Sequence, residues 1–378
     1  MEQYRHGGEI YDKKVTLDFS VNTNPLGLPE GVRMALITNT DSFSLYPDNK
    51  YTELKTALAD YEKLDRDFII CGNGASDLIF RLCYALKPEK AMVTAPAFSE
   101  YEKALREVDS SVVYFSLKEE EDFKVTGQLL NQLDKTLDLL FLCCPNNPTG
   151  SLIPQELLKE IVEKCHKNDI FLFMDECFMD FTDEEDKYSL KRYLIDNDRI
   201  FILKAFTKFY AMAGIRLGYG LCGNKELLKR ISGIGPAWNV SIPAQIAGVN
   251  ALKENSYRLE SRELIKRERN YLYGGLCALG LKVFAPAANY IFFKGPQSLY
   301  KELLAKGILI RQCDNYVGLN KEFYRVAVKN HNENGILLKE IKECLGIRDS
   351  VNYEVHNSHP DCIPYNKTTC YAGGSHSL

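Results

Sequence analysis

Residues 139–175 read LLFLCCPNNPTGSLIPQELLKEIVEKCHKNDIFLFMD, and this stretch decides the fold. An apolar run of strand length opens it, and a second run, FLFMD, closes it. The segment between them has a helical pattern, with apolar side chains on one face at Leu157, Leu158, Ile161, Val162 and Cys165. Strand, helix and strand in this order predict two parallel strands joined by a crossover helix.

Four more apolar runs of strand length lie around this unit, at residues 67–74, 90–96, 111–117 and 199–206. Amphipathic helical patterns separate them. We therefore expect an α/β fold whose mainly parallel sheet is flanked by helices, with a smaller α/β domain after it. In such sheets ligands bind at the carboxyl ends of the strands.

Length and composition exclude several classes of protein. A chain of 378 residues can bury a large core, and its net charge of −4 offers no basic surface for nucleic acid. The start is polar, and no apolar run approaches the roughly 20 residues that cross a bilayer. Most of the twelve cysteines sit singly in apolar runs. We expect a reduced, cytoplasmic protein that binds neither nucleic acid nor a membrane.

The chain is expected to divide into four parts. Residues 1–38 form an N-terminal segment that packs with a small domain, and 39–262 form the large domain. Residues 263–346 form the small C-terminal domain, which a charged helix at about 252–275 connects to the large one. Residues 347–378 are a separate tail without apolar periodicity.

The tail is rich in metal-binding residue types, namely His356, His359, His376, Cys362 and Cys370. Their spacing matches no standard zinc finger, and many proteins end in disordered tails. Both interpretations stay open, and we assign no residue to a metal site.

Three of the expected strands run directly into a charged or amide side chain: Asn147, Asp175 and Lys208. A buried carboxylate or ammonium group costs several kcal/mol unless it has a partner. Such groups at neighbouring strand ends suggest a polar ligand between them.

A glycine-rich turn at Gly74, Ala75 and Ser76 opens a helix. Free backbone N–H groups at a helix start bind anions. The turn is neither a Walker A loop nor a GxGxxG motif. We expect it to hold a phosphate, with help from Thr207 and Arg216.

One ligand, pyridoxal phosphate, accounts for the turn and the strand ends together. Lys208 would form a Schiff base with its aldehyde, and Asp175 would keep its ring nitrogen protonated. Asn147 would bind the 3-hydroxyl group, and Phe98 would stack on the ring.

The motifs NGAS, CPNNPTG, DECF and TKFYAMAGIRLGYG occur in this order. In that order they resemble fold-type I pyridoxal-phosphate enzymes of the class I/II aminotransferase group, over residues 1–346. The resemblance implies that Lys208 is the Schiff-base residue and that Arg216 binds the cofactor phosphate. It also implies a homodimer, in which Tyr46 reaches the partner's cofactor phosphate.

Two branches of that group are similar to this chain: histidinol-phosphate aminotransferases and threonine-phosphate decarboxylases of cobalamin synthesis. The second is more similar, through RHGGEI at 5–10, LDFSVNTNPLG at 17–27 and IRQCDNYVGL at 310–319. Phe178 also stands where aminotransferases usually have a tyrosine. This branch implies decarboxylation of L-threonine O-3-phosphate to (R)-1-aminopropan-2-yl phosphate.

The same resemblance gives a substrate site. Arg325 would hold the substrate carboxylate bidentately. The substrate phosphate would lie against His6, Gly8, Asn24 and Arg311. Three alternatives stay open: an aminotransferase acting on histidinol phosphate, a decarboxylase of O-phospho-L-serine, and a cofactor-binding regulator without turnover.

Each assigned residue also has an ordinary structural interpretation. Asp175 could cap a helix or form an ion pair, and Arg216 and Arg325 could be solvated side chains. Phe98 and Phe178 could simply pack in the core.

Overall fold

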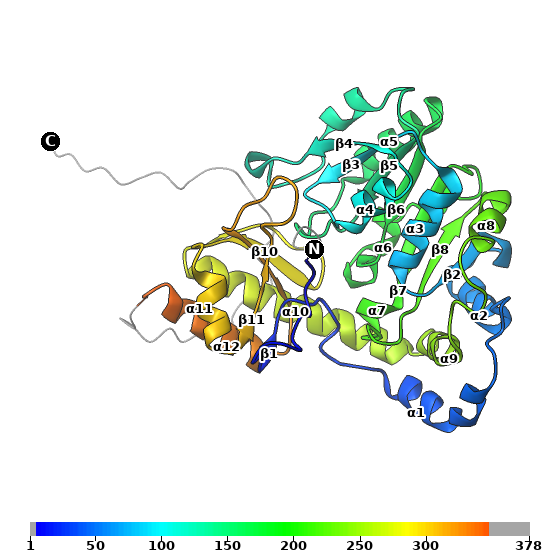
Figure 1. Cartoon of the computed structure of the whole chain (residues 1–378). Helices are drawn as coiled ribbons and strands as arrows, with labels where there is room; N and C mark the ends of the chain where they lie inside the picture. The colour runs from blue at the N-terminus through cyan, green and yellow to red at the C-terminus, as the bar shows by residue number, and fades with distance from the viewer. Residues whose placement is uncertain (1–4, 348–378) are drawn as a thin grey trace.

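The computed structural model describes residues 5–347, and its largest sheet has seven strands in the order β2-β8-β7-β6-β5-β3-β4 (Figure 1). All neighbouring strands are parallel except β8, which is antiparallel to both β2 and β7. Its strands are β2 (Ile69–Gly72), β3 (Lys90–Ala95), β4 (Ser111–Ser116), β5 (Leu139–Cys143), β6 (Phe171–Asp175), β7 (Ile200–Ala205) and β8 (Gly218–Cys222). The expected α/β fold with a mainly parallel sheet is confirmed.

Helices cover this sheet and connect its parallel strands (Figure 1). The helix expected inside the opening stretch is α5 (Gln155–Lys167), and it buries Leu158, Ile161, Val162 and Cys165. The other helices of this part are α1 (Glu30–Thr38), α2 (Thr52–Glu62), α3 (Ala75–Leu86), α4 (Glu100–Arg106), α6 (Glu185–Tyr188), α7 (Phe206–Phe209), α8 (Lys225–Ser232) and α9 (Ile242–Ala251).

Aromatic side chains tie the central strands together. Phe141 on β5 contacts Phe173 on β6 with ring centroids 4.6 Å apart, and Phe173 stacks on Phe201 of β7 at 5.6 Å. All three rings are fully buried. These contacts fix β5, β6 and β7 relative to one another, and therefore fix the loops at their carboxyl ends.

The later part of the chain forms a second, antiparallel sheet of four strands in the order β12-β13-β10-β9. Its strands are β9 (Lys282–Val283), β10 (Tyr290–Lys294), β12 (Arg311–Gln312) and β13 (Phe323–Ala327), and its helices are α10 (Asn255–Ala278), α11 (Leu299–Ala305) and α12 (His331–Cys344). Near the N-terminus, β1 (Leu17–Asp18) pairs in parallel with β11 (Ile308–Leu309).

The long helix α10 runs from the seven-stranded part into the four-stranded part (Figure 1). The domain boundary that we propose at residue 262 therefore falls inside a continuous helix. Apart from Ile347, the Cys/His tail lies outside the described residues. Between residues 5 and 347, no helix is both long and apolar enough to cross a membrane.

Candidate active site

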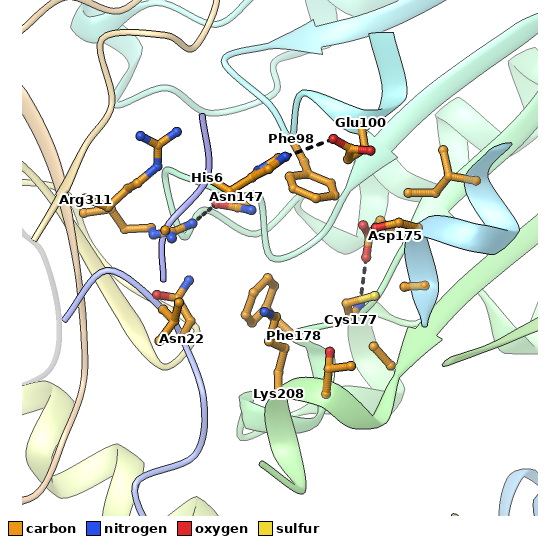
Figure 2. A pocket seen from close by; sticks show the side chains of 18 of the residues that line it. His6, Asn22, Phe98, Glu100, Asn147, Asp175, Cys177, Phe178, Lys208 and Arg311 are labelled. Atoms are coloured by element: carbon orange, nitrogen blue, oxygen red, sulfur yellow. Dashed lines mark hydrogen bonds and ion pairs between the residues drawn. The ribbon is translucent and has the colours of Figure 1, made fainter. Parts of the chain in front are cut away.

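A cavity of about 450 Å³ lies at the carboxyl ends of β5, β6 and β7. These strands are parallel neighbours, so the residues that follow them meet at one edge of the sheet. Figure 2 shows Asp175 and Lys208 facing this cavity. The sequence-predicted residues that line it are His6, Ala75, Ser76, Phe98, Asn147, Asp175, Thr207, Lys208, Arg216, Arg311 and Arg325.

Lys208 lies on α7, directly after β7, and its half-buried side chain faces the cavity. Desolvation lowers the pKa of its amine from 10.5 to about 8, and the positive charges of Arg325 and Arg216 add to this effect. Cys177 and Asp175 act in the opposite direction. A substantial fraction of this amine is therefore neutral near pH 8 and can attack a carbonyl carbon.

Asp175 ends β6 and is almost fully buried. Its Oδ1 accepts a hydrogen bond from the backbone N–H of Cys177 at 2.9 Å, and its Oδ2 accepts one from the Tyr101 hydroxyl at 2.5 Å. Burial raises the pKa of the carboxyl group, while these two hydrogen bonds and Lys208 oppose the rise. The charged form of Asp175 is therefore costly to bury, but its two hydrogen bonds and the Lys208 amine stabilise it.

The glycine-rich turn forms an open cradle at the start of α3. Gly74 precedes the helix with φ +81°, a conformation that favours glycine, and no side chain caps the helix. A Cβ atom on Gly74 would lie 2.6 Å from Nη2 of Arg216. On β8, a Cβ atom on Gly218 would lie 2.6 Å from the backbone nitrogen of Ala75. The two glycines therefore allow Arg216 and strand β8 to lie close to the start of α3 and its backbone N–H groups.

Asn147 and Arg325 meet on another wall of the cavity. Arg325 Nη1 donates to Asn147 Oδ1, and Nη2 donates to the Ser20 carbonyl at 2.8 Å. The Nε atom of Arg325 is buried without a hydrogen-bond partner among the described residues. Arg325 itself lines the cavity, so its guanidinium group borders the space that a ligand would occupy.

The segment of residues 5–8 lies across the cavity from Lys208 (Figure 2). His6 Nε2 lies 3.0 Å from Oε1 of Glu100, and its ring contacts Phe98 with centroids 5.7 Å apart. Arg311 Nη2 donates to the carbonyl of Arg5 at 2.6 Å. His6 and Arg311, far apart in sequence, are thereby held at one side of the cavity.

Four sequence-predicted residues are not part of the cavity lining: Gly8, Tyr46, Asn24 and Gly74, which directly precedes the lining residue Ala75. The backbone N–H of Gly8 donates to Ser20 Oγ at 2.8 Å, so Gly8 braces the N-terminal segment. Tyr46 is exposed, and its ring lies 4.5 Å from that of Trp238. Asn24 also lies outside the cavity lining.

Asn24 is buried and has structural partners. Its Nδ2 donates to the carbonyl of Phe209 at 2.8 Å and to Ser261 Oγ at 2.7 Å. Asn22 lines the cavity instead, and its buried Oδ1 has no hydrogen-bond partner among the described residues. Because Asn22 lines the cavity and Asn24 does not, we replace Asn24 with Asn22 as the proposed substrate contact, through its Nδ2 donor.

Tyr101 and Glu100 were not predicted from the sequence. Tyr101 lies three residues after Phe98, a spacing that places two side chains on the same side of a helix start. This spacing is the sequence feature from which a role for Tyr101 could have been predicted. Its hydrogen-bond partner, Asp175, lies at the end of β6, 74 residues further along the chain.

The cavity fits the expected pyridoxal phosphate. It combines a lysine amine of lowered pKa, a buried carboxyl group and a helix start that only glycine allows to be approached closely. Between residues 5 and 347, no group of three or more His, Cys, Asp or Glu side chains could hold a metal ion.

Comparison with known proteins gives consistent results. The profile of the family "Aminotransferase class I and II" matches residues 14–341. Threonine-phosphate decarboxylase of Salmonella typhimurium is 37% identical over 354 residues, which covers 90% of this chain and 96% of the relative.

Two solved structures are also similar. The histidinol-phosphate aminotransferase of Clostridium acetobutylicum has a TM-score of 0.82 at 33% identity, covering 87% of this chain and 99% of that one. The L-threonine-O-3-phosphate decarboxylase of Porphyromonas gingivalis has a TM-score of 0.77 at 22% identity, with the same coverage of both chains. The second comparison supports the fold alone.

Proposed function

The chain belongs to the aminotransferase class I and II family, and from this premise we propose that it is a pyridoxal-phosphate-dependent decarboxylase. Its substrate is L-threonine O-3-phosphate, and its product is (R)-1-aminopropan-2-yl phosphate for cobalamin synthesis. The similarity to the Salmonella decarboxylase over nearly the whole of both chains supports this substrate. The structural observation that carries the proposal is that Lys208 and Asp175 reach one cavity from adjacent parallel strands.

We assign the cofactor contacts as follows. Lys208 would hold the aldehyde carbon, Asp175 the ring nitrogen and Asn147 the 3-hydroxyl group, and Phe98 would contact the ring. The phosphate contacts are Gly74, Ala75, Ser76, Thr207 and Arg216. When bound, pyridoxal phosphate withdraws the electrons that remain on the substrate Cα after a bond to it breaks.

The chain's own residues hold the two anionic ends of the substrate. Arg325 binds the carboxylate, and His6, Arg311 and the Nδ2 donor of Asn22 bind the phosphate. The separation of these two groups would fix the orientation of the substrate at the cofactor. The pKa of Lys208, about 8, lies close to neutral pH. Its Nζ can therefore deliver the proton that Cα requires once carbon dioxide has left.

An aminotransferase acting on histidinol phosphate is the second candidate. The similarity to the Clostridium acetobutylicum structure favours it, because that match combines the same fold with substantial sequence identity. A decarboxylase of O-phospho-L-serine would use the same carboxylate and phosphate contacts.

One assay separates these candidates. The purified protein is incubated with pyridoxal phosphate and threonine phosphate without any keto acid, and carbon dioxide is measured. We expect release without an acceptor, and O-phospho-L-serine in a parallel reaction ranks the two substrates. Turnover that occurs only with histidinol phosphate and 2-oxoglutarate would replace the decarboxylase with the aminotransferase.

We propose that the enzyme acts as a homodimer in the cytoplasm. A group of exposed apolar side chains supports the dimer: Met34, Ile37, Phe43, Leu45, Tyr46 and Trp238. Tyr46 would then contact the cofactor phosphate of the partner, beside the exposed Arg216. The cytoplasmic location is supported by seven buried free cysteines in the part of the chain that forms the large sheet and its helices: Cys71, Cys83, Cys143, Cys144, Cys165, Cys177 and Cys222.

A further inference from the structure

Tyr101 is a fully buried tyrosine behind the candidate active site. It is the second residue of α4, and its hydroxyl group lies 2.5 Å from Oδ2 of Asp175. Its ring stacks on Phe141 at 5.1 Å and meets Phe98 edge-on at 5.7 Å. This one side chain therefore contacts both Asp175 and Phe98, which we have assigned to the cofactor ring.

The two hydrogen bonds of Asp175 leave room for further donors. Oδ1 accepts from Cys177 and Oδ2 from Tyr101, and an ionised carboxylate can accept about four hydrogen bonds in total. Two bonds on two different oxygens also fix the plane of the carboxylate. A ring nitrogen that carries a proton can then donate to a carboxylate that is already oriented.

The location of one proton depends on the Tyr101 hydroxyl. A ring N–H⁺ beside a carboxylate and a bare ring nitrogen beside a carboxylic acid contain the same atoms and the same net charge. Burial favours the neutral pair, because separated charges are poorly solvated there. Donation from a hydroxyl group favours the charged pair, because hydrogen bonds to ionised acceptors are roughly twice as strong as neutral ones.

We propose that Tyr101 is a positioning residue, which orients Asp175 and keeps the shared proton on the cofactor ring nitrogen. The proposal rests on the proposed pyridoxal phosphate site. Tyr101 does not line the cavity and acts through Asp175. Its ring packing would be retained in a phenylalanine, so the hydroxyl group alone carries this role.

The test uses Tyr101→Phe in the full chain, with Tyr219→Phe as a matched control. Tyr219 is also a buried tyrosine that donates to a carboxylate, Oε1 of Glu62 at 2.6 Å, but neither residue lines the active-site cavity. Two quantities are measured: the ¹⁵N chemical shift of ring-labelled pyridoxal phosphate bound to each protein, and the affinity for pyridoxal phosphate and for its analogue with carbon in place of the ring nitrogen.

We expect Tyr101→Phe to move the ¹⁵N resonance toward that of an unprotonated pyridine. Its affinity for pyridoxal phosphate should fall about tenfold or more, the effect of one hydrogen bond to a charged group. Affinity for the carbon analogue should not change, because the analogue has no ring nitrogen to protonate. Tyr219→Phe should leave all three values at those of the wild type.

An unchanged ¹⁵N shift in Tyr101→Phe would overturn the proposal, as would equal losses of affinity for both ligands. If Tyr101→Phe does not fold, 4-aminophenylalanine at position 101 replaces it, since its N–H group is a weaker donor than a phenol and should move the resonance toward an unprotonated ring. No movement there also overturns the proposal. A wild-type protein that does not bind pyridoxal phosphate at all would instead refute the proposed function.

Discussion

At the scale of single residues, Lys208 makes the clearest prediction about pH. Its pKa is about 8 in the cofactor-free cavity, below the ordinary 10.5, and only the neutral amine attacks an aldehyde. The rate at which the cofactor-free protein captures pyridoxal phosphate should rise about tenfold per pH unit below pH 8 and level off above it. Stopped-flow absorbance from pH 6 to 11 measures this profile.

Arg325→Gln provides the control for that profile. The Arg325 guanidinium is the second cause of the lowered pKa, after desolvation, so its removal should move the midpoint to higher pH. A wild-type midpoint near 10.5 would contradict the buried, positively charged environment that we describe.

Lys208→Ala tests the attachment point directly. Without an amine at this position the cofactor has no covalent link, so the yellow absorbance of the bound form should disappear and decarboxylation should fall by at least about 1,000-fold. Dialysis should then remove the cofactor from the variant while the wild type retains it. Persistent colour and turnover would place the link on another lysine.

The sequence identified most cavity residues because their motifs fix the backbone around them. The sequence did not distinguish Asn24 from Asn22, because the two asparagines lie two positions apart in one irregular segment. Only the fold shows which of them lines the cavity. Asn24 meets Phe209 and Ser261, which are distant in sequence. Tyr101 was missed for the same reason, because its partner Asp175 is on another element.

At the scale of elements, Gly218 on β8 controls where α3 begins. A methyl group there would lie 2.6 Å from the Ala75 nitrogen, and both sides of this contact are backbone. Gly218→Ala should therefore push the phosphate cradle out of position and cost about 1–3 kcal/mol of stability. We also expect a pyridoxal phosphate affinity reduced by about tenfold or more, measured by titration beside chemical unfolding.

Gly127→Ala is the matched control, because a Cβ atom there meets nothing within 4 Å and the residue lies outside the cavity lining. It should leave cofactor affinity unchanged. If Gly218→Ala also binds the cofactor as tightly as the wild type, the close packing of β8 on α3 does not shape the cradle.

Six of the seven strands of the large sheet were predictable from apolar runs alone. The exception, β8, reads GYGLC, and its two glycines weaken any strand signal. Its neighbours require those glycines, since a Cβ atom on Gly220 would lie 2.1 Å from the Phe201 ring. Close packing between strands, which a single sequence does not reveal, makes this segment a strand.

At the scale of the whole molecule, the exposed apolar group around α1 and Trp238 predicts a dimer interface. Ile37→Arg puts a charge into that interface and should convert dimers to monomers in sedimentation velocity. Because Tyr46 of the partner would then be missing from the phosphate site, cofactor affinity should fall in parallel. Ile195→Arg is the control, since Ile195 is also exposed and lines a pocket that contains no residue of this group.

A dimer that persists in Ile37→Arg, with unchanged cofactor affinity, would move the interface elsewhere. The control variant should sediment as the wild type does. At this scale the residues themselves predicted the fold, whereas the dimer followed from the family resemblance alone, because an interface depends on a surface that only a folded chain presents.

The strand order of the large sheet has a consequence for synthesis on the ribosome. β2 is an edge strand whose only neighbour in the sheet is β8, and residues 73–217 separate the two. A nascent chain can assemble β3 to β7 as they emerge, but β2 must wait until residue 222 has left the exit tunnel. The phosphate cradle directly after β2 is therefore among the last parts of the large sheet to be completed, and a chain stalled before β8 would display an unpaired strand to chaperones.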